Sequence, residues 1–381
     1  MTAPMIGILG ASGAVGSTAL ASLVSEGRYV LRAGYRSRPP RGDTTSCVER
    51  QQVDVDDEAS LARFCKSCSV VLNAAGPSCR IGDRVARAAD AAGAHYVDAF
   101  GGALLVQQLT TLPLSPERCV IHSAGVYPGL SALLPRWMAG QGFDLVLALR
   151  GWAGGRERCT PAAAADVLLS TVQGFGQAGT AWVEGRRMAG ALAPRDAVEV
   201  VGFPGRVRVQ PFFSEELEQL VVELGLHDAQ WNNVMPGART IGIISRWRSR
   251  LGTPESIDET WLAQAVAELV QTAQLDVAGQ TPYYRLVIEM EGVRAEQPHH
   301  LRAVLRAPDS YCVSGAVAAS AALCLLDAPP EPGVHSADRV LVWNAVRDRL
   351  QTWGVIEAFN LVELSADDIH AATTSVEEGA L

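Results

Sequence analysis

Short apolar runs divide the first 130 residues into segments of regular length. Apolar runs bounded by turn residues are typical of buried strands, whereas apolar positions three and four residues apart are typical of helices. The pattern predicts strands at 5–9, 29–35, 52–55, 69–73, 95–98 and 119–123. Helices are predicted between them, at 17–24, 58–64 and 82–92. This alternation indicates an α/β fold with a doubly wound parallel sheet of the Rossmann type.

The pattern changes near residue 145, where longer elements replace the regular alternation. Strands are predicted at 145–150, 283–291 and 301–306, and helices at 160–172, 214–224 and 256–274. In the strand that begins at Tyr283, Leu286, Ile288 and Met290 would share one face. We therefore expect an α+β second domain with a mostly antiparallel sheet, and we expect that sheet to carry the contact of a homodimer.

Domain boundaries follow from these elements. We expect a first domain over 1–130, a second over 131–339, a helical segment over 340–364 that packs back on the first domain, and an acidic tail over 365–381. The longest apolar stretch, 313–326, is shorter than the roughly 20 residues that span a bilayer, so it predicts a buried helix. With no basic and apolar leader at the start, the sequence favours a cytoplasmic location.

Composition narrows the function classes. Of 381 residues, 48% are hydrophobic and 19% charged, which is enough apolar material for a core and excludes global disorder. A net charge of −9 disfavours nucleic-acid binding. Cys65 and Cys68 form a C-x-x-C pair with no second pair nearby, so no metal is expected. Lysine is almost missing, because Lys66 stands alone among 32 basic residues.

The first glycines form a Gly10-x-x-Gly13-x-x-Gly16 motif between a predicted strand and a predicted helix. That context is the one in which such glycines let the backbone approach a pyrophosphate, with the helix N-terminus donating to the phosphates. A strand, turn and helix that uses glycine only for packing is the alternative. The motif predicts a dinucleotide site.

The second strand ends in Tyr35-Arg36-Ser37-Arg38, where NAD-binding proteins usually carry an acidic residue for the ribose 2′-hydroxyl. Two guanidinium groups and a hydroxyl would instead hold a 2′-phosphate. A solvated basic turn is the alternative. The sequence therefore predicts NADPH as the cofactor.

The scarcity of lysine excludes several chemistries. The residue four positions before Lys66 is Ala62, so the tyrosine and lysine pair of short-chain dehydrogenases is missing. Lys66 also lacks the context of a P-loop or a pyridoxal Schiff base. No cysteine follows an asparagine, as the nucleophile of aspartate-semialdehyde dehydrogenases would. Hydride transfer without a covalent intermediate, or cofactor binding alone, remains.

Several runs resemble the saccharopine dehydrogenase-like NADP-dependent reductases, over residues 5 to 357 and most closely over the first 130. The matching runs are Asn73-Ala74-Ala75-Gly76-Pro77, the segments 82–88 and 92–98, Ala124-Gly125-Val126-Tyr127-Pro128-Gly129-Leu130, and the closing segments 315–327, 332–334 and 353–355. From the glycine motif, the basic turn and these runs, the expected cofactor contacts are Gly10, Ser12, Gly13, Ala14, Val15, Gly16, Arg36, Ser37, Arg38, Asn73, Ala75, Gly76, Pro77 and Gly125.

Within that family the chain looks similar to the thiazolinyl imine reductases of enantio-pyochelin-type siderophore biosynthesis. The resemblance implies NADPH-dependent reduction of a thiazoline C=N bond to a thiazolidine, on an intermediate bound to the carrier protein of a nonribosomal peptide synthetase. Two alternatives stay open. One is an amino-acid dehydrogenase of the saccharopine type, and the other is a catalytically silent NADPH-binding protein.

Reduction of a C=N bond needs a hydride on carbon and a proton or hydrogen bond at nitrogen. The candidates lie near the carboxyl ends of the predicted strands, where ligands of doubly wound sheets collect. Tyr127, in a glycine-flanked loop that borders the nicotinamide in the resemblance, is the first choice as donor. His122 is the second choice and Asp98 the third. Their structural alternatives are core packing for Tyr127 and His122, and turn capping for Asp98.

The segment 244–250 carries Arg246, Arg248 and Arg250 and is the most basic run of an acidic chain. Such a run is usually a solvated face. The alternative is a docking surface for an acidic carrier protein or its phosphopantetheine arm.

Overall fold

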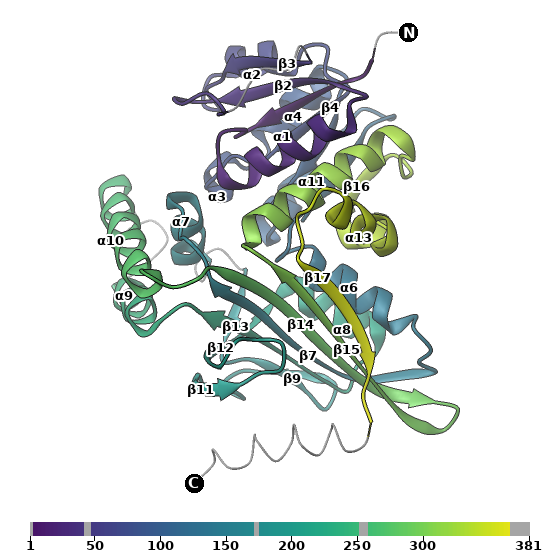
Figure 1. Cartoon of the computed structure of the whole chain (residues 1–381). Helices are drawn as coiled ribbons and strands as arrows, with labels where there is room; N and C mark the ends of the chain where they lie inside the picture. Colours follow the sequence, from purple (N-terminus) through teal and green to yellow (C-terminus); the bar gives the residue numbers. More distant parts are fainter. Residues whose placement is uncertain (1–2, 42–46, 171–174, 251–257, 366–381) are drawn as a thin grey trace.

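The computed structural model describes residues 3–41, 47–170, 175–250 and 258–365, and these residues build two sheets that lie one above the other (Figure 1). All strand pairs of the first sheet are parallel, in the order β16-β6-β5-β4-β1-β2-β3. The predicted doubly wound Rossmann sheet is confirmed. Its strands are β1 (Met5–Leu9), β2 (Val30–Tyr35), β3 (Val48–Gln52), β4 (Val70–Asn73), β5 (His95–Asp98), β6 (Cys119–His122) and β16 (Gly333–Ser336).

Apolar layers cover both faces of this sheet, which is why its central strands are continuous apolar runs in the sequence. Ile6, Ile8 and Leu72 pack into one layer, and Leu9 and Val71 into the other. The helices that follow the strands in this part of the chain are α1 (Ala14–Glu26), α2 (Glu58–Cys65), α3 (Ser78–Ile81), α4 (Arg84–Ala91), α5 (Ala103–Thr111) and α6 (Leu130–Ala139).

The strand expected at 52–55 is displaced toward the N-terminus, to Val48–Gln52. β3 pairs only with β2, so it is an edge strand, and its polar sequence fits a strand with one open side. Val53 is buried just beyond the strand, and Val53 and Val55 line the large cavity described below. Apolar side chains therefore mark a cavity wall at 53–55 rather than the strand itself.

The second sheet is mostly antiparallel, as expected, with β7 (Leu145–Arg156) and β13 (Asp228–Met235) forming a parallel pair. Leu286, Ile288 and Met290 are fully buried on one face of β14 (Tyr283–Arg294), which confirms the predicted alternation. The other strands are β8 (Gly176–Ala178), β9 (Ala181–Val183), β10 (Arg186–Met188), β11 (Arg195–Glu199), β12 (Arg206–Ser214), β15 (Gln297–Ala307) and β17 (Ala358–Glu363).

Three helices form a group at one end of the second sheet, α7 (Pro161–Leu169), α9 (Ala238–Arg248) and α10 (Glu259–Val277) (Figure 1). The Thr160 side chain accepts a hydrogen bond from the Ala163 N–H, the N-cap that the Thr-Pro pair predicts. Ser214 caps α8 (Glu215–Leu224) in the same way, through the Leu217 N–H. The sequence predicts where α7 and α8 begin because each helix starts with a capping side chain of its own.

The expected domain boundary at residue 339 is wrong, because β16 joins the first sheet beside β6. The long helix α11 (Ser310–Asp327) also belongs there, since it packs along α1 (Figure 1). The chain returns to the first domain near residue 310. Of the segment 340–364, α13 (Trp343–Thr352) packs on α11 as expected, but β17 pairs with β15 of the second sheet. The predicted tail lies outside the described residues, apart from Ser365.

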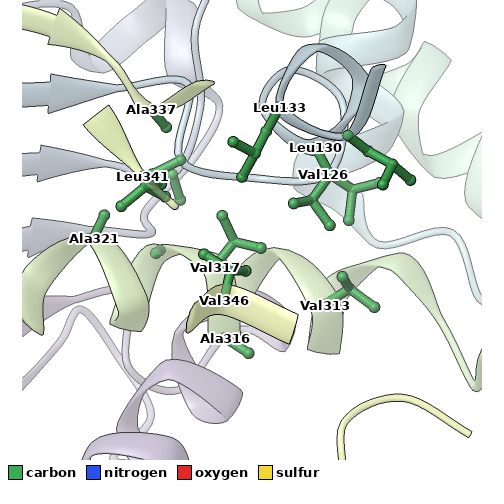
Figure 2. Close-up of a cluster of buried hydrophobic side chains, with 14 of the residues drawn as sticks. Val126, Leu130, Leu133, Val313, Ala316, Val317, Ala321, Ala337, Leu341 and Val346 are labelled. Atoms are coloured by element: carbon green, nitrogen blue, oxygen red, sulfur yellow. The ribbon is translucent and has the colours of Figure 1, made fainter. Parts of the chain in front are cut away.

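In the described part of the chain, α11 alone is long and apolar enough to cross a membrane. Eleven of its residues are buried inside the fold, so the helix serves as a core element here. Figure 2 shows its position: Val313 and Val317 face Leu130, the first residue of α6, and Val126 in the loop before it, and Leu341 belongs to the same cluster. One continuous apolar cluster thus links the two domains.

Two glycines within helices give matched predictions of opposite sign. A Cβ on Gly315 of α11 would lie 2.3 Å from the Val15 carbonyl oxygen, whereas a Cβ on Gly242 of α9 would meet nothing within 4 Å. Gly315→Ala should lower the free energy of unfolding by about 1–3 kcal/mol through overpacking. Gly242→Ala should raise it by about 0.5–1 kcal/mol, because alanine is the better helix former. Urea unfolding of both variants tests the prediction, and equal shifts would contradict the close packing of α11 on α1.

Candidate active site

A cavity of about 1450 Å³ lies between the two sheets. The carboxyl ends of β1, β2, β4 and β6 line one side, and α7, α9, α10 and the adjoining strands of the second domain line the other. Pockets for a single small ligand typically measure about 300–1,000 Å³. The cavity therefore has room for a dinucleotide and a second ligand.

The glycine turn after β1 has the shape that a pyrophosphate needs. Gly10 has a positive φ of 73°, and a Cβ there would lie 2.7 Å from the backbone of Ala74 and Ala75. Gly13 is the N-cap of α1 and offers no side-chain cap, and the first turn holds no acidic residue. The N–H groups of that turn therefore remain for an anion. Ser12, Gly13, Ala14 and Val15 line the cavity, as does Gly10.

Gly16 does not line the cavity, although it was an expected cofactor contact. A Cβ at this position would lie 2.2 Å from the Gly10 carbonyl oxygen. Gly16 therefore allows α1 to pack closely under the turn, which supports the site without touching a ligand.

The basic turn after β2 stands where the ribose of a dinucleotide would lie. Arg36, Ser37 and Arg38 are exposed and line the cavity. Within the described ranges neither arginine has an ion-pair partner. The turn therefore offers uncompensated positive charge to a 2′-phosphate, and the residues present fit NADPH.

The remaining expected cofactor contacts, most of them in the loop after β4, fall into two groups. Ala75 and Gly76 line the cavity, as Gly125 of the later loop does, whereas Asn73 and Pro77 do not. The Asn73 side chain instead accepts a hydrogen bond of 3.1 Å from the Ala75 N–H and donates one of 3.1 Å to the Asp98 carboxylate. Asn73 thus holds the loop in place from behind.

Tyr127 lines the cavity, and its ring stacks on Trp231 with 5.1 Å between the ring centroids. The hydroxyl oxygen is buried and makes no well-aligned hydrogen bond to any described residue. Burial raises the pKa of the phenol despite the nearby Ser214 hydroxyl. Tyr127 therefore keeps its proton at neutral pH, and its hydroxyl has no well-aligned acceptor among the described residues.

His122 also lines the cavity and lies 3.0 Å, Nδ1 to Oγ, from Ser123. Burial lowers the pKa of its imidazole to about 4. At neutral pH the ring is uncharged, so an imidazolium donor is scarce. A hydrogen bond from the neutral ring to a ligand is still open to it.

Asp98 does not line the cavity. Its carboxylate accepts hydrogen bonds from the Asn73 amide, the Tyr96 hydroxyl and the Phe100 N–H. Burial raises its pKa to about 6. The geometry favours the capping alternative, in which Asp98 fixes the loops after β4 and β5, and its role as a proton donor stays an untested prediction.

Burial raises the pKa to about 6 or higher in three acidic side chains that line the cavity from the second domain and that the sequence interpretation did not single out. They are Glu157 with a pKa of about 7, Asp166 with about 6 and Glu216 with about 8. The only sequence signal for Glu216 was its place two residues after the Ser214 cap. Glu157 and Asp166 carried none, because burial by distant elements creates their state.

Each of these carboxyl groups accepts a hydrogen bond from another segment of the chain. Glu216 accepts from the Gly129 N–H at 2.7 Å and from the Ser131 hydroxyl, so it holds the loop that carries Tyr127. Glu157 accepts from the Ser310 N–H at 2.6 Å at the start of α11. Asp166 of α7 accepts from the Ser78 N–H at 3.2 Å, just after the cofactor loop.

Covalent and metal chemistry find no support in the described residues. No group of three or more potential ligands could hold a metal ion there. Cys159 lines the cavity, but burial raises the pKa of its thiol to about 11, so it is a poor nucleophile at neutral pH. Lys66 is exposed and lies outside the cavity lining.

A dinucleotide site that shares a cavity with a second domain is typical of NADP-dependent oxidoreductases. Residues 6–118 match the family described as the saccharopine dehydrogenase NADP binding domain. The first domain is therefore similar to the NADP-binding domain of saccharopine dehydrogenases, and the predicted NADPH cofactor is confirmed. A search of the curated proteins finds no match.

Among solved structures, the whole chain is similar to apo saccharopine dehydrogenase (L-Glu forming) from Saccharomyces cerevisiae. The match covers 95% of this chain and 100% of that chain, with a TM-score of 0.64 and 11% identity. A DAP dehydrogenase from C. glutamicum matches over 92% of this chain and 99% of that chain, with a TM-score of 0.48 and 14% identity. At the 11% identity of the yeast match, the similarity shows a shared two-domain fold.

Arg36→Ala should weaken NADPH binding much more than NADH binding. A charge-assisted hydrogen bond is worth about 1.5–3 kcal/mol, which corresponds to roughly a 10- to 100-fold rise in Kd for NADPH. NADH, without the 2′-phosphate, should change by less than about threefold. Fluorescence titration of both cofactors measures this, with Arg63→Ala on the exposed side of α2 as the charge-matched control. Equal losses for both cofactors would contradict the 2′-phosphate assignment.

Glu216→Gln should change how stability depends on pH. The pKa of Glu216 lies near 8 in the fold, above its ordinary value of 4.5, so its ionisation lowers wild-type stability as pH rises from about 4.5 to about 8. Glutamine stays neutral throughout. Relative to the wild type, the free energy of unfolding of the variant should therefore rise by about 2–3 kcal/mol between pH 5 and pH 8.5, as measured by urea unfolding. Parallel pH profiles would refute the buried neutral carboxyl, and Glu218→Gln on the same helix is the control.

Proposed function

We propose that this protein is an NADPH-dependent reductase of C=N bonds. The observation that carries the proposal is the shared cavity, in which an NADP site borders a tyrosine whose buried hydroxyl has no well-aligned acceptor among the described residues. Reduction of an imine needs these two components and no covalent help from the protein. The high pKa of the Cys159 thiol and the place of Lys66 outside the cavity agree with a mechanism of this kind.

Each residue of the site has a separate proposed role. Bound NADPH supplies the hydride from its nicotinamide C4. Gly125 lets the loop after β6 pack closely against the neighbouring backbone, since a Cβ there would lie 2.7 Å from the Ala99 carbonyl oxygen. Tyr127 donates its hydroxyl proton, or a hydrogen bond, to the imine nitrogen as negative charge develops on it. Glu216 keeps the Tyr127 loop in place through the Gly129 N–H.

The specific substrate that we propose is a thiazoline, reduced to a thiazolidine with protonation of the ring nitrogen. We also propose that it is bound to the carrier protein of a nonribosomal peptide synthetase, in a siderophore pathway, and that the enzyme is a cytoplasmic homodimer. The resemblance of the sequence to thiazolinyl imine reductases is the basis for this choice. The cavity of about 1450 Å³ exceeds the usual volume of a single small-ligand pocket, which supports a bulky substrate beside the cofactor.

A second candidate is an amino-acid dehydrogenase of the saccharopine type. The full-length fold similarity to the yeast saccharopine dehydrogenase favours it. A catalytically silent NADPH-binding protein is a third candidate, and the second domain, which completes a cavity for another ligand, argues against it.

Loss of NADPH absorbance with a thiazoline thioester is the direct test. We expect turnover with NADPH and much less with NADH. Glutamate plus a semialdehyde is the control substrate for the saccharopine-type alternative. Turnover with that pair alone would replace the thiazoline as the proposed substrate, and tight NADPH binding without turnover on either substrate would favour the silent binder.

Tyr127→Phe separates the two proposed donors from each other. Loss of a general acid or positioned donor typically costs about 10²–10⁴-fold in rate. Tyr127→Phe should therefore lower kcat at least 100-fold, with the Kd for NADPH unchanged. His122→Ala should cost less than about tenfold, because burial keeps the imidazole uncharged at neutral pH. A large loss in His122→Ala with little in Tyr127→Phe would exchange their roles.

A further inference from the structure

Two arginines of the second domain line the cavity without an ion-pair partner among the described residues, the exposed Arg158 and the partly buried Arg248. Arg248 lies at the end of α9 and lines the cavity. Its Nη2 donates to the Val167 carbonyl oxygen at 2.8 Å and to the Ser170 hydroxyl at 3.0 Å. Its Nε is buried with no hydrogen-bond partner among the described residues. Burial lowers its pKa, and no carboxylate among those residues counters the effect.

Several other partly buried arginines of this chain are paired, whereas Arg118, whose buried Nε also lacks a partner, has no ion pair with a described residue. Arg136 contacts Glu223 and Asp338, and Arg302 contacts Glu289 at 2.6 Å. A guanidinium removed from water needs such compensation, because its charge stays at any physiological pH. The carboxyl end of α7 gives Arg248 part of it. The side chain itself is part of the cavity wall.

Neighbours of Arg248 on the basic run have different surroundings. Arg246 pairs with Glu268 of α10, and the Arg250 guanidinium lies 5.5 Å from the Trp247 ring centroid. Neither lines the cavity. The three arginines of the run therefore have different surroundings: Arg246 is in an ion pair, Arg250 contacts a ring, and Arg248 lines the cavity. Of the docking surface considered for this run, only Arg248 can contact a ligand in the cavity.

A stripe of α9 surrounds that charge with apolar and small side chains. Thr240, Ile244 and Arg248 are four residues apart, so they share one face of the helix, and all three line the cavity. Leu269 of α10 lines it too and packs in one buried cluster with Ile244. The subsite therefore offers one positive charge beside an apolar wall.

We propose that Arg248 binds an anionic group, a carboxylate or a phosphate, of the substrate whose reduction is proposed above, on which this inference rests. Ile244 and Leu269 contact the apolar part of that substrate. The NADPH phosphates already have Arg36, Arg38 and the α1 N-terminus, so the anion at Arg248 belongs to the second ligand. Its source is the carboxylate of a free acid or the phosphate of a carrier protein's pantetheine arm.

Matched ligand pairs test the charge preference without turnover. Pantetheine 4′-phosphate is compared with pantetheine, and benzoate with benzamide, by NMR titration of the NADPH-saturated protein. We expect one anionic member to bind at least about tenfold more tightly than its neutral partner, as a charge-assisted hydrogen bond to arginine would give. Preference in the phosphate pair indicates a carrier-bound substrate, and preference in the benzoate pair a free acid.

Variants attribute the preference to one side chain. Arg248→Gln should abolish it, Arg248→Lys should retain most of it, and Arg250→Gln should leave it unchanged. The structural role at the end of α7 would lower stability in Arg248→Gln without changing the ratio of the two dissociation constants. A preference that survives in Arg248→Gln, or no preference in either pair, overturns the proposal.

Two further readouts keep the test decisive. If Arg248→Gln does not fold, the ¹⁵N-labelled wild type replaces it. The Nε resonance of Arg248 must then shift when the anionic ligand is added and not when its neutral partner is added. A resonance that shifts with neither ligand overturns the proposal. If Arg248→Gln raises the Kd for NADPH about tenfold, the anion is the cofactor's own and the substrate assignment is wrong. Failure of the thiazoline assay alone would remove the proposed reaction and leave the charge preference measurable.

Discussion

The close packing of α11 on α1 is the interaction on which the rest of the structure depends. Gly315 lets the two helices approach until their backbones touch, and the apolar side chains of α11 then cover one face of the parallel sheet. The same helix extends the core toward α6 and the second sheet. Its first turn brings Ser310 to Glu157 at the edge of the cavity. A single apolar helix therefore completes one domain and sets the position of the other.

Most of the fold could be predicted because its signals are local. β1 has the predicted bounds, since a strand buried on both faces is a continuous apolar run between polar turns, and the shorter β5 has them too. The edge strand β3 was displaced because it is polar. The boundary at 339 was wrong because β16 is short and its partner β6 lies far away in the sequence, so no local pattern marks the pairing.

The cofactor half and the substrate half of the cavity also differ in how well the sequence predicts them. The cofactor half follows from glycines and arginines within one strand-turn-helix unit and the next strand, and all of these positions except Gly16 line the cavity. The other half is assembled from separate elements. Glu216 and Arg248 are ordinary helix residues in the sequence, and only the packing of distant segments buries the first as a neutral acid and leaves the second without a carboxylate. His122 shows the converse, since burial removes the charge that its residue type suggests.

The late return of the chain to the first sheet has a consequence for synthesis on the ribosome. When residues 3–139 have emerged, the parallel sheet still lacks α11 on one face and β16 at one edge. Its apolar side chains and unpaired edge stay open while the whole second domain is being made, a state that invites association with other chains. The first domain to be translated is thus among the last to be finished. We expect the nascent chain to require a chaperone until α11 leaves the exit tunnel.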